Sequence, residues 1–81
     1  MRARSHRPAA RTLFDEELRS ALDEIRGAPR IGSVYEMVGG REYRRLLMPQ
    51  TRHHVYYRVV GPDHVRVLAV WSAVRGRGPR L

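Results

Sequence analysis

The second half of the chain contains three runs of β-branched and aromatic residues that are separated by short turn signals. The runs cover residues 42–48, 52–60 and 64–71. Pro49 bounds the first run, and Gly61-Pro62-Asp63 provides a tight turn between the last two. Such short connections join strands in antiparallel order. The sequence therefore predicts an antiparallel meander. Apolar residues on both faces of the last run predict that it is the central strand, covered on one side by a helix.

The first half of the chain contains one amphipathic helix, predicted over residues 12–26. Its apolar stripe recurs at helical spacing and comprises Phe14, Leu18, Ala21, Leu22 and Ile25. Thr12 is the predicted N-cap, with Asp15 as its capping-box partner. Gly27 and Pro29 end the helix.

A fourth, short strand over residues 34–38 would form a hairpin through Gly39-Gly40. The predicted fold class is therefore α+β, with an N-terminal helix packed on a three- to four-stranded antiparallel sheet. Residues 1–11 show no apolar period and are predicted to be a flexible basic arm, which leaves residues 12–81 as the folded domain. Trp71 is expected in the core, because simple alternation places it on one face with Val65 and Val67.

The charge of the chain points to an anionic partner. Sixteen basic residues, all of them arginine, face eight acidic ones, which gives a formal net charge of +8. The planar, forked guanidinium suits phosphate and carboxylate groups, so we expect either a polyanion or an acidic protein as partner. No apolar run is long enough to span a bilayer, and we expect a cytoplasmic protein without a membrane partner.

Motifs for a metal, a cofactor or hydrolytic chemistry are absent from the sequence. Cysteine does not occur, and the neighbouring residues His53 and His54 would point to opposite faces of a strand. Gly39-Gly40 lacks the lysine and the helix of a phosphate-binding loop. We therefore predict neither a metal site nor a cofactor.

A surface of arginine, histidine and tyrosine side chains on the strands remains. Its members are Arg45, His54, Tyr56, Arg58, Arg66 and Arg75. Alternation places three of them, His54, Tyr56 and Arg58, on one strand face. Such a surface can hold phosphates and stack bases. Contact with nucleic acid or the ribosome, contact with an acidic protein, and an ordinary solvated sheet face all fit this pattern.

Four segments in this order resemble the RelE/ParE superfamily, the toxins of type II toxin–antitoxin systems. They are YRRLL (residues 43–47), TRHHVYYRV (51–59), VRVLAVW (65–71) and the closing WSAVRGRGP (71–79). The upstream helix and Pro29-Arg30-Ile31-Gly32 also fit, so the resemblance covers about residues 13–81.

The resemblance implies a growth-inhibiting toxin that is neutralised by a cognate acidic antitoxin. A ParE-like member poisons DNA gyrase, and a RelE-like member cleaves mRNA on the ribosome. An inactive remnant or a non-catalytic basic module that binds nucleic acid or protein is the remaining alternative. A homodimer and a toxin–antitoxin hetero-oligomer are both compatible with the resemblance.

The chain departs from the family pattern at its start. Members usually open with a strand and a first helix, for which residues 1–11 are too short and too polar. We therefore expect a toxin that is shortened at the N-terminus, with a sheet edge and an apolar patch left open.

By position, the resemblance also suggests catalytic residues. Arg45 falls at a basic position of the mRNA-cleaving branch, and His54 and Arg75 fall at two arginine positions. Leu47 replaces a further basic residue, and Leu81 lies near the place of a tyrosine. The residues expected to bind RNA or another target are Arg44, Arg52, Tyr56, Arg58 and Arg77.

Overall fold

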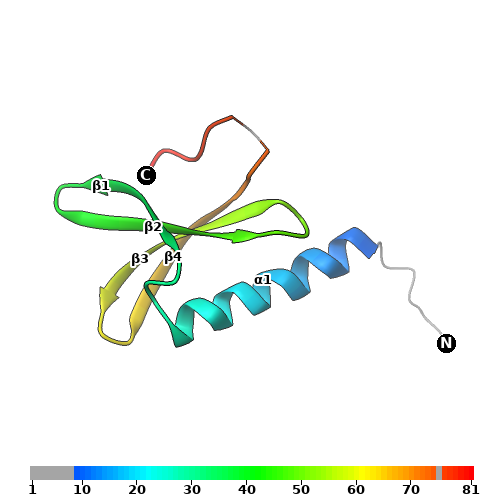
Figure 1. The fold of residues 1–81 in the computed structure, drawn as a ribbon, viewed down its shortest axis with the longest axis horizontal. Coiled ribbons are helices and arrows are strands. Elements are labelled where there is room, and N and C mark those ends of the chain that lie inside the picture. Colours follow the sequence, from blue (N-terminus) through cyan, green and yellow to red (C-terminus); the bar gives the residue numbers. More distant parts are fainter. Residues whose placement is uncertain (1–8, 75) are drawn as a thin grey trace.

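Within the residues that the structure describes, one helix and one antiparallel sheet make up the fold (Figure 1). The structure, a computed structural model, describes residues 9–74 and 76–81. The elements are α1 (Ala9–Gly27), β1 (Ser33–Val38), β2 (Arg41–Met48), β3 (His53–Gly61) and β4 (His64–Ser72). The strands are ordered β1-β2-β3-β4, and each pairs antiparallel with the next. The predicted α+β fold is thus confirmed. Within the described residues, no helix is long and apolar enough to cross a membrane.

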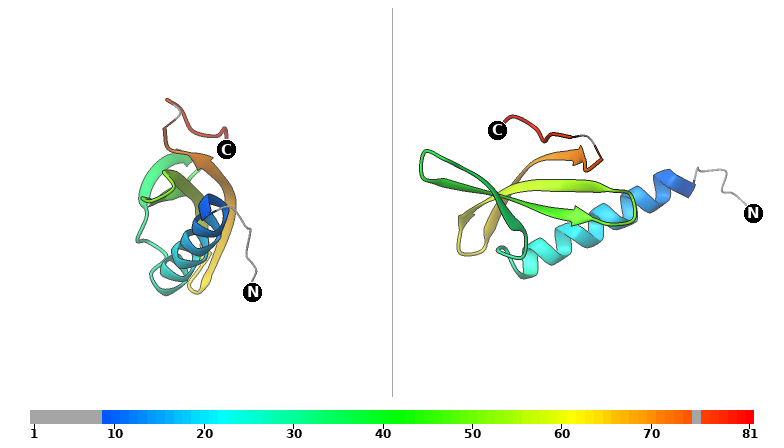
Figure 2. Two further views of the ribbon diagram at one scale, coloured as in Figure 1. Left: turned by 90° about the vertical axis from the view of Figure 1, so that its right-hand side faces the viewer. Right: turned by 45° about the horizontal axis from the view of Figure 1, so that its top comes forward.

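The core lies between α1 and the face of the sheet that this helix covers (Figure 2). Its buried members are Ala21, Ile25, Met48, Val55 and Tyr57. The stripe residues Phe14, Leu18 and Leu22 pack around them and remain partly exposed. Removal of this apolar surface from water is what fixes α1 to the sheet.

The helix begins earlier than predicted. It starts at Ala9, so Thr12 lies inside the helix and does not cap it. The residues Ala9, Ala10 and Arg11 have high helix propensity, which favours the longer helix. Of the predicted flexible arm, residues 1–8 lie outside the described residues and residues 9–11 belong to α1. The division into an arm and a toxin domain stays a prediction.

The hairpin between β1 and β2 is formed as predicted. Gly39 and Gly40 connect the two strands with φ angles of +58° and +81°. Residues with a side chain rarely adopt this left-handed backbone conformation. The glycine pair therefore closes the turn with little strain.

The connection from α1 to β1 is anchored to the sheet by two side chains. The Tyr57 hydroxyl accepts a hydrogen bond of 2.9 Å from the Gly32 amide. The Arg44 guanidinium donates to the carbonyl oxygens of Arg30 and Gly32. A Cβ atom at Gly32 would lie 2.7 Å from both the Arg45 carbonyl oxygen and the Tyr57 hydroxyl. Glycine is therefore required at this crossing.

The prediction that residues 64–71 form the central strand is wrong. β4 is an edge strand, and β3 lies inside the sheet with Val55, Tyr56 and Tyr57 buried. On β4, Val67 and Leu68 keep 45% and 37% of their surface exposed. The expectation of an open, partly apolar sheet edge therefore fits β4.

A β-bulge explains the apolar residues on both faces of β4. Tyr56 pairs with Ala69 and Tyr57 pairs with Val67, which leaves Leu68 without a partner in the register. The extra residue shifts the alternation by one. Val70 lies opposite Val55 on the helix-covered face, whereas Trp71 lies opposite His54 on the other face. The prediction that Trp71 packs in the core is therefore wrong.

Candidate functional site

The candidate site lies on the face of the sheet turned away from α1, here called the open face. The strand register places a set of polar and aromatic side chains on it, which comprises Tyr43, Arg45, Leu47, His54, Tyr56, Arg58, Arg66 and Trp71. The predicted sharing of one strand face by His54, Tyr56 and Arg58 is consistent with this register.

The chain after β4 turns back above the open face, where the C-terminal residues come close to β1 and β2 (Figures 1 and 2). A groove of about 470 Å³ lies between this segment and the sheet. Its lining residues are Tyr35, Arg45, His54, Tyr56, Ser72, Ala73, Gly76, Arg77 and Gly78. The groove thus combines two tyrosines, a histidine and two arginines.

Aromatic contacts organise the floor of the groove. The rings of Tyr35 and Tyr56 meet edge to face with centroids 4.8 Å apart, and the His54 ring lies 5.9 Å from that of Tyr56. The guanidinium carbon of Arg45 lies 5.2 Å from the Tyr35 ring centroid, and Arg45 donates a hydrogen bond of 3.5 Å to the Tyr56 hydroxyl. Cation–π attraction therefore holds the Arg45 side chain on the sheet.

The C-terminal segment is fitted closely onto the two tyrosines. A Cβ atom at Gly78 would lie 2.5 Å from the Tyr35 hydroxyl and 2.7 Å from the Tyr56 hydroxyl. The Tyr35 hydroxyl donates to the carbonyl oxygen of Pro79, which is itself buried. Tyr56 is 1% exposed. Its ring is therefore part of the packing between the sheet and the C-terminal segment.

The surroundings of His54 favour the neutral form of its ring by lowering its pKa. Burial lowers its pKa below the usual 6.5, and the positive charge of Arg45 lowers it further. Both effects disfavour the imidazolium form. A neutral imidazole can accept a proton or a hydrogen bond, but it adds no charge to the groove.

The structure brings together only part of the predicted site. Arg45, His54, Tyr56 and Arg77 line the groove, whereas Arg58 lies on the same face beyond it. Arg75 lies outside the described residues.

Two predicted target-binding arginines lie elsewhere. Arg44 points to the helix-covered side, where it holds Glu42 at 3.1 Å and the α1–β1 connection. Arg52 lies in the β2–β3 turn with a φ of +61°. Arg44 is thus engaged in structural contacts.

Tyr35 and Ser72 also line the groove, although neither was predicted from the sequence. The register slips at Tyr35, between Val34 and Glu36, and this bulge orients the Tyr35 ring toward Tyr56. Trp71 lies beside the groove and donates a hydrogen bond of 3.0 Å to the Arg77 carbonyl oxygen. A pattern of strict alternation along one strand gives no indication of the bulge at Tyr35 or of the bulge at Leu68.

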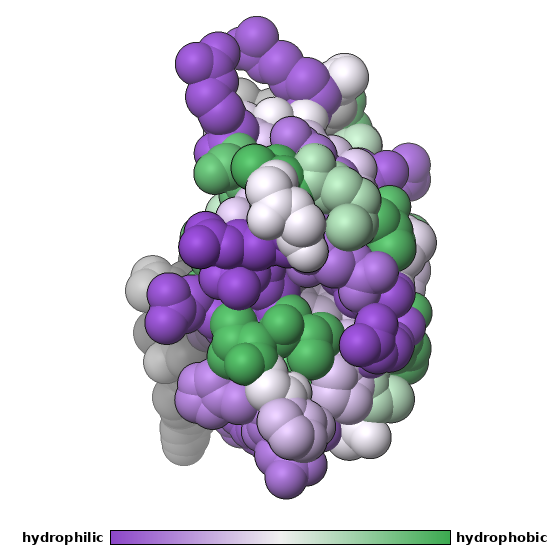
Figure 3. Space-filling view, turned by 90° about the vertical axis from the view of Figure 1, so that its left-hand side faces the viewer, coloured by the Kyte–Doolittle hydropathy of each residue, from purple (hydrophilic) through white to green (hydrophobic). Residues whose placement is uncertain are grey.

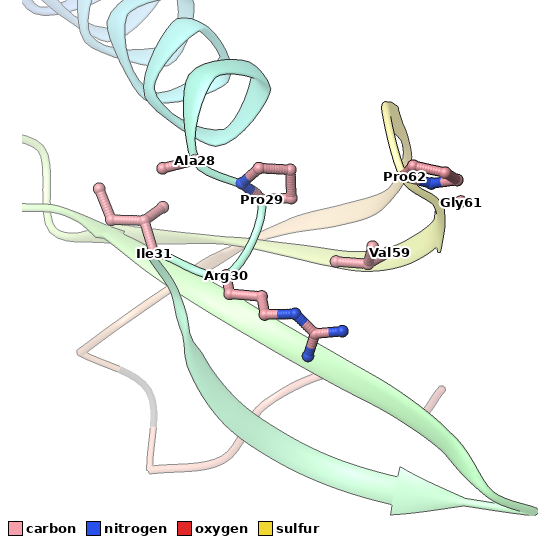
Figure 4. A pocket seen from close by; sticks show the side chains of 7 residues that line it. All are labelled: Ala28, Pro29, Arg30, Ile31, Val59, Gly61 and Pro62. Atoms are coloured by element: carbon pink, nitrogen blue, oxygen red, sulfur yellow. The ribbon is translucent and has the colours of Figure 1, made fainter.

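A second hollow, of about 750 Å³, lies at the other end of the fold between the α1–β1 connection and the β3–β4 turn (Figure 4). It is lined by Ala28, Pro29, Arg30, Ile31, Val59, Gly61 and Pro62. Figure 3 shows this end of the molecule, where apolar patches are divided by hydrophilic side chains. The charged lining residue, Arg30, is paired with Glu42 at 3.1 Å. This hollow therefore lacks the converging polar groups typical of a reactive site.

The family model described as the ParE toxin of the type II toxin–antitoxin system parDE matches residues 2–76, a span that includes α1 and all four strands. The chain belongs to the ParE toxin family. The resemblance to the RelE/ParE superfamily is thereby confirmed. Neither the curated proteins nor the solved structures contain a match to the chain.

Membership of the ParE toxin family makes this chain the toxin of a type II toxin–antitoxin system and implies an antitoxin as its partner. In the described part of this ParE toxin, the groove on the open face and the outer edge of β4 each have a composition suited to a partner.

Proposed function

We propose that this toxin inhibits growth by acting on DNA gyrase in the cytoplasm and that an acidic antitoxin neutralises it. The family match supports the toxin role, and gyrase is the target that the ParE resemblance implies. The observation that carries the choice of gyrase over mRNA cleavage is the burial of Tyr56 beneath Gly78.

An RNA-cleaving toxin needs acid–base groups that reach the 2′-hydroxyl and the phosphate of its substrate. Here Arg45 is engaged by the Tyr35 ring, and the Tyr56 hydroxyl lies against the C-terminal segment. Leu47, which stands where the mRNA-cleaving branch has a basic residue, lies opposite His54 and is 45% exposed. An apolar side chain at this place does not stabilise phosphorane charge. These contacts favour a non-catalytic toxin.

Two features support an acidic antitoxin. The net charge of +8 attracts a negatively charged chain. No strand of the described residues pairs with the outer edge of β4, where Val67 and Leu68 are exposed. This edge can accept an added strand or a helix that covers apolar surface. The partner would thereby stabilise the folded toxin by mass action.

The test is a supercoiling assay with purified gyrase and the purified toxin. We expect loss of supercoiling and accumulation of double-strand breaks in the plasmid. In induced cells, primer extension should show intact transcripts. A folded His54→Ala variant should remain toxic, because in this proposal His54 transfers no proton.

A different set of results would contradict the gyrase proposal. Unchanged supercoiling, together with new 5′ ends within codons and loss of toxicity in His54→Ala, would overturn the gyrase proposal in favour of mRNA cleavage. For the antitoxin, the product of the neighbouring gene should co-purify with the toxin at low salt. Separate purification of the two proteins would contradict that part of the proposal.

A further inference from the structure

A row of three side chains crosses the open face next to the groove. Arg66 of β4 lies directly opposite Arg58 of β3, which in turn lies opposite Tyr43 of β2. We propose that this row, here called the arginine row, binds the phosphate backbone of duplex DNA. This activity goes beyond inhibition of gyrase, because it is a property of the toxin alone.

Two like charges, those of Arg58 and Arg66, are paired across the strands. Side chains directly opposite on antiparallel strands lie about 5 Å apart at Cβ, and like charges at that distance destabilise a sheet. Within residues 9–74 and 76–81, neither Arg58 nor Arg66 has a carboxylate within ion-pair distance, although Arg26, Arg30 and Arg44 do. An anion bound between the two guanidinium groups would remove the repulsion.

Acidic and basic side chains are separated between the two sides of the sheet. Five of the eight acidic residues belong to α1, which covers the opposite face. Glu42 also lies on that side and is engaged by Arg30 and Arg44. Glu36 of β1 shares the open face, but Tyr43 separates it from Arg58 in the register. Asp63, the eighth acidic residue, lies in the β3–β4 turn and forms no ion pair with the described residues. In the described part of the chain, the arginine row therefore presents a positive surface without a paired carboxylate.

One of the two guanidinium groups, that of Arg58, is held in place before a ligand binds. The Cζ atom of Arg58 lies 5.8 Å from the centroid of the Tyr43 ring, and this ring is buried. The contact restrains the side chain before any ligand binds, so less entropy is lost on binding. A planar, restrained guanidinium can donate two hydrogen bonds to one phosphate.

The composition of the row distinguishes DNA from other anionic partners. An amphipathic acidic peptide needs exposed apolar surface directly beside the charges. The exposed Val67 lies opposite Tyr57 on the other face of the sheet, and the exposed Leu47 of the open face lies opposite His54, away from the row. Single-stranded nucleic acid needs aromatic rings on which bases stack, whereas Tyr43 and Tyr56 are buried. A charged, weakly apolar surface is typical of contact with a duplex backbone. The choice of DNA over duplex RNA rests on the proposed gyrase target.

The experiment measures binding of the purified toxin to a short fluorescent DNA duplex by anisotropy at several salt concentrations, without gyrase. The test variant is Arg58→Gln/Arg66→Gln. The matched control is Arg19→Gln/Arg26→Gln, which removes the same charge from exposed positions on α1. We expect the test variant to bind about tenfold more weakly, with a salt slope smaller by about 2. The control should stay within about twofold of the parent.

Thermal melting separates loss of the site from loss of the fold. Arg66→Gln alone should melt at or above the temperature of the parent toxin, because it relieves the repulsion with Arg58. It should still bind DNA more weakly. If the double variant does not fold, Arg66→Gln decides the question.

Equal losses of affinity in the test and control variants would show that net charge alone attracts DNA, and would overturn the proposal. Equal affinity for duplex RNA would overturn the choice of DNA, and stronger binding to a polyglutamate peptide would assign the row to an acidic protein. Gyrase is absent from this binding assay. A negative result in it therefore does not affect the supercoiling test of the proposed function.

Discussion

The hydroxyl of Tyr57 donates a hydrogen bond of 2.7 Å to the carbonyl oxygen of Pro29, which ties strand β3 to the connection that follows α1. The same hydroxyl accepts the Gly32 amide. Tyr57→Phe should leave this buried amide without its partner and lower the free energy of unfolding by about 1–3 kcal/mol. Urea denaturation of the two proteins measures the difference.

Tyr43→Phe is the control for that measurement. Tyr43 is also buried, but in the described part of the chain its hydroxyl makes no hydrogen bond. We expect a change of less than about 0.5 kcal/mol. Equal destabilisation by both substitutions would contradict the role given to the Tyr57 hydroxyl.

The fit of the C-terminal segment is tested at Gly78. Gly78→Ala places a methyl group within 2.7 Å of the Tyr35 and Tyr56 hydroxyls, so the segment should move away from the sheet. Trp71, the single tryptophan, donates to Arg77 in this segment and reports the movement. Acrylamide should quench its fluorescence more strongly in the variant.

Gly76→Ala is the matched control for this experiment, since an added Cβ atom there meets no other atom within 4 Å. Its quenching should equal that of the parent protein. If Gly78→Ala also behaves like the parent, the segment does not lie on the two tyrosines in solution.

The lowered pKa of His54 predicts a pH-dependent stability. The folded protein disfavours the imidazolium form, so the unfolded chain binds more protons as the pH falls through about 6.5. The stability that the neutral His54 ring contributes is fully present above that pH. It decreases below that pH, as the pH approaches the lowered pKa of the folded state. The melting temperature should fall between about pH 7 and pH 5, and His54→Asn should reduce this fall.

His64→Asn provides the comparison, because His64 is an exposed histidine at the start of β4. It should leave the slope of melting temperature against pH as in the parent. A slope that is unchanged in His54→Asn would refute the assignment.

Glu17 is expected to hold the β2–β3 turn against α1. Its carboxylate accepts hydrogen bonds from the amides of Gln50 and Thr51 and from the Thr51 hydroxyl, at 2.7–2.9 Å. Burial alone would raise the pKa of Glu17, but these hydrogen bonds keep it below the usual 4.5. Glu17→Gln replaces one acceptor oxygen with a donor, so hydrogen exchange at the Gln50 and Thr51 amides should become faster.

The neighbouring Glu16 serves as the control, since it is exposed and forms no hydrogen bond with the described residues. Exchange at the two turn amides should not change in Glu16→Gln. Faster exchange in both variants would mean that the charge of α1, and not the contact of Glu17, protects the turn.

The strands and turns of this fold could be predicted from local chemistry. The glycine pair at 39–40 and the Gly61-Pro62-Asp63 turn mark where the chain reverses, and the predicted strand bounds differ by only one or two residues from those observed. The start of α1 was missed, because Thr12 is a good N-cap in isolation while Ala9 and Ala10 extend the helix past it.

The order of strands and the composition of the site were harder to predict. Leu68 bulges out of the β3–β4 register, which makes β4 resemble a strand buried on both faces and moves Trp71 to the open face. Tyr35 enters the groove through a second bulge. Bulges depend on the pairing of two strands, and a period-2 pattern read along one strand contains no information about them.

The bulged edge of β4 has a consequence for handling the protein. Its outward backbone groups lie beside the exposed side chains of Val67 and Leu68, and such an edge is a template for strands of other molecules. Other toxin molecules therefore compete with any partner that covers β4 for the same backbone hydrogen-bonding groups. Which of the two binds depends on the concentration of the toxin. Dilute toxin should stay monomeric, whereas concentrated toxin prepared alone should form edge-to-edge assemblies that bind thioflavin.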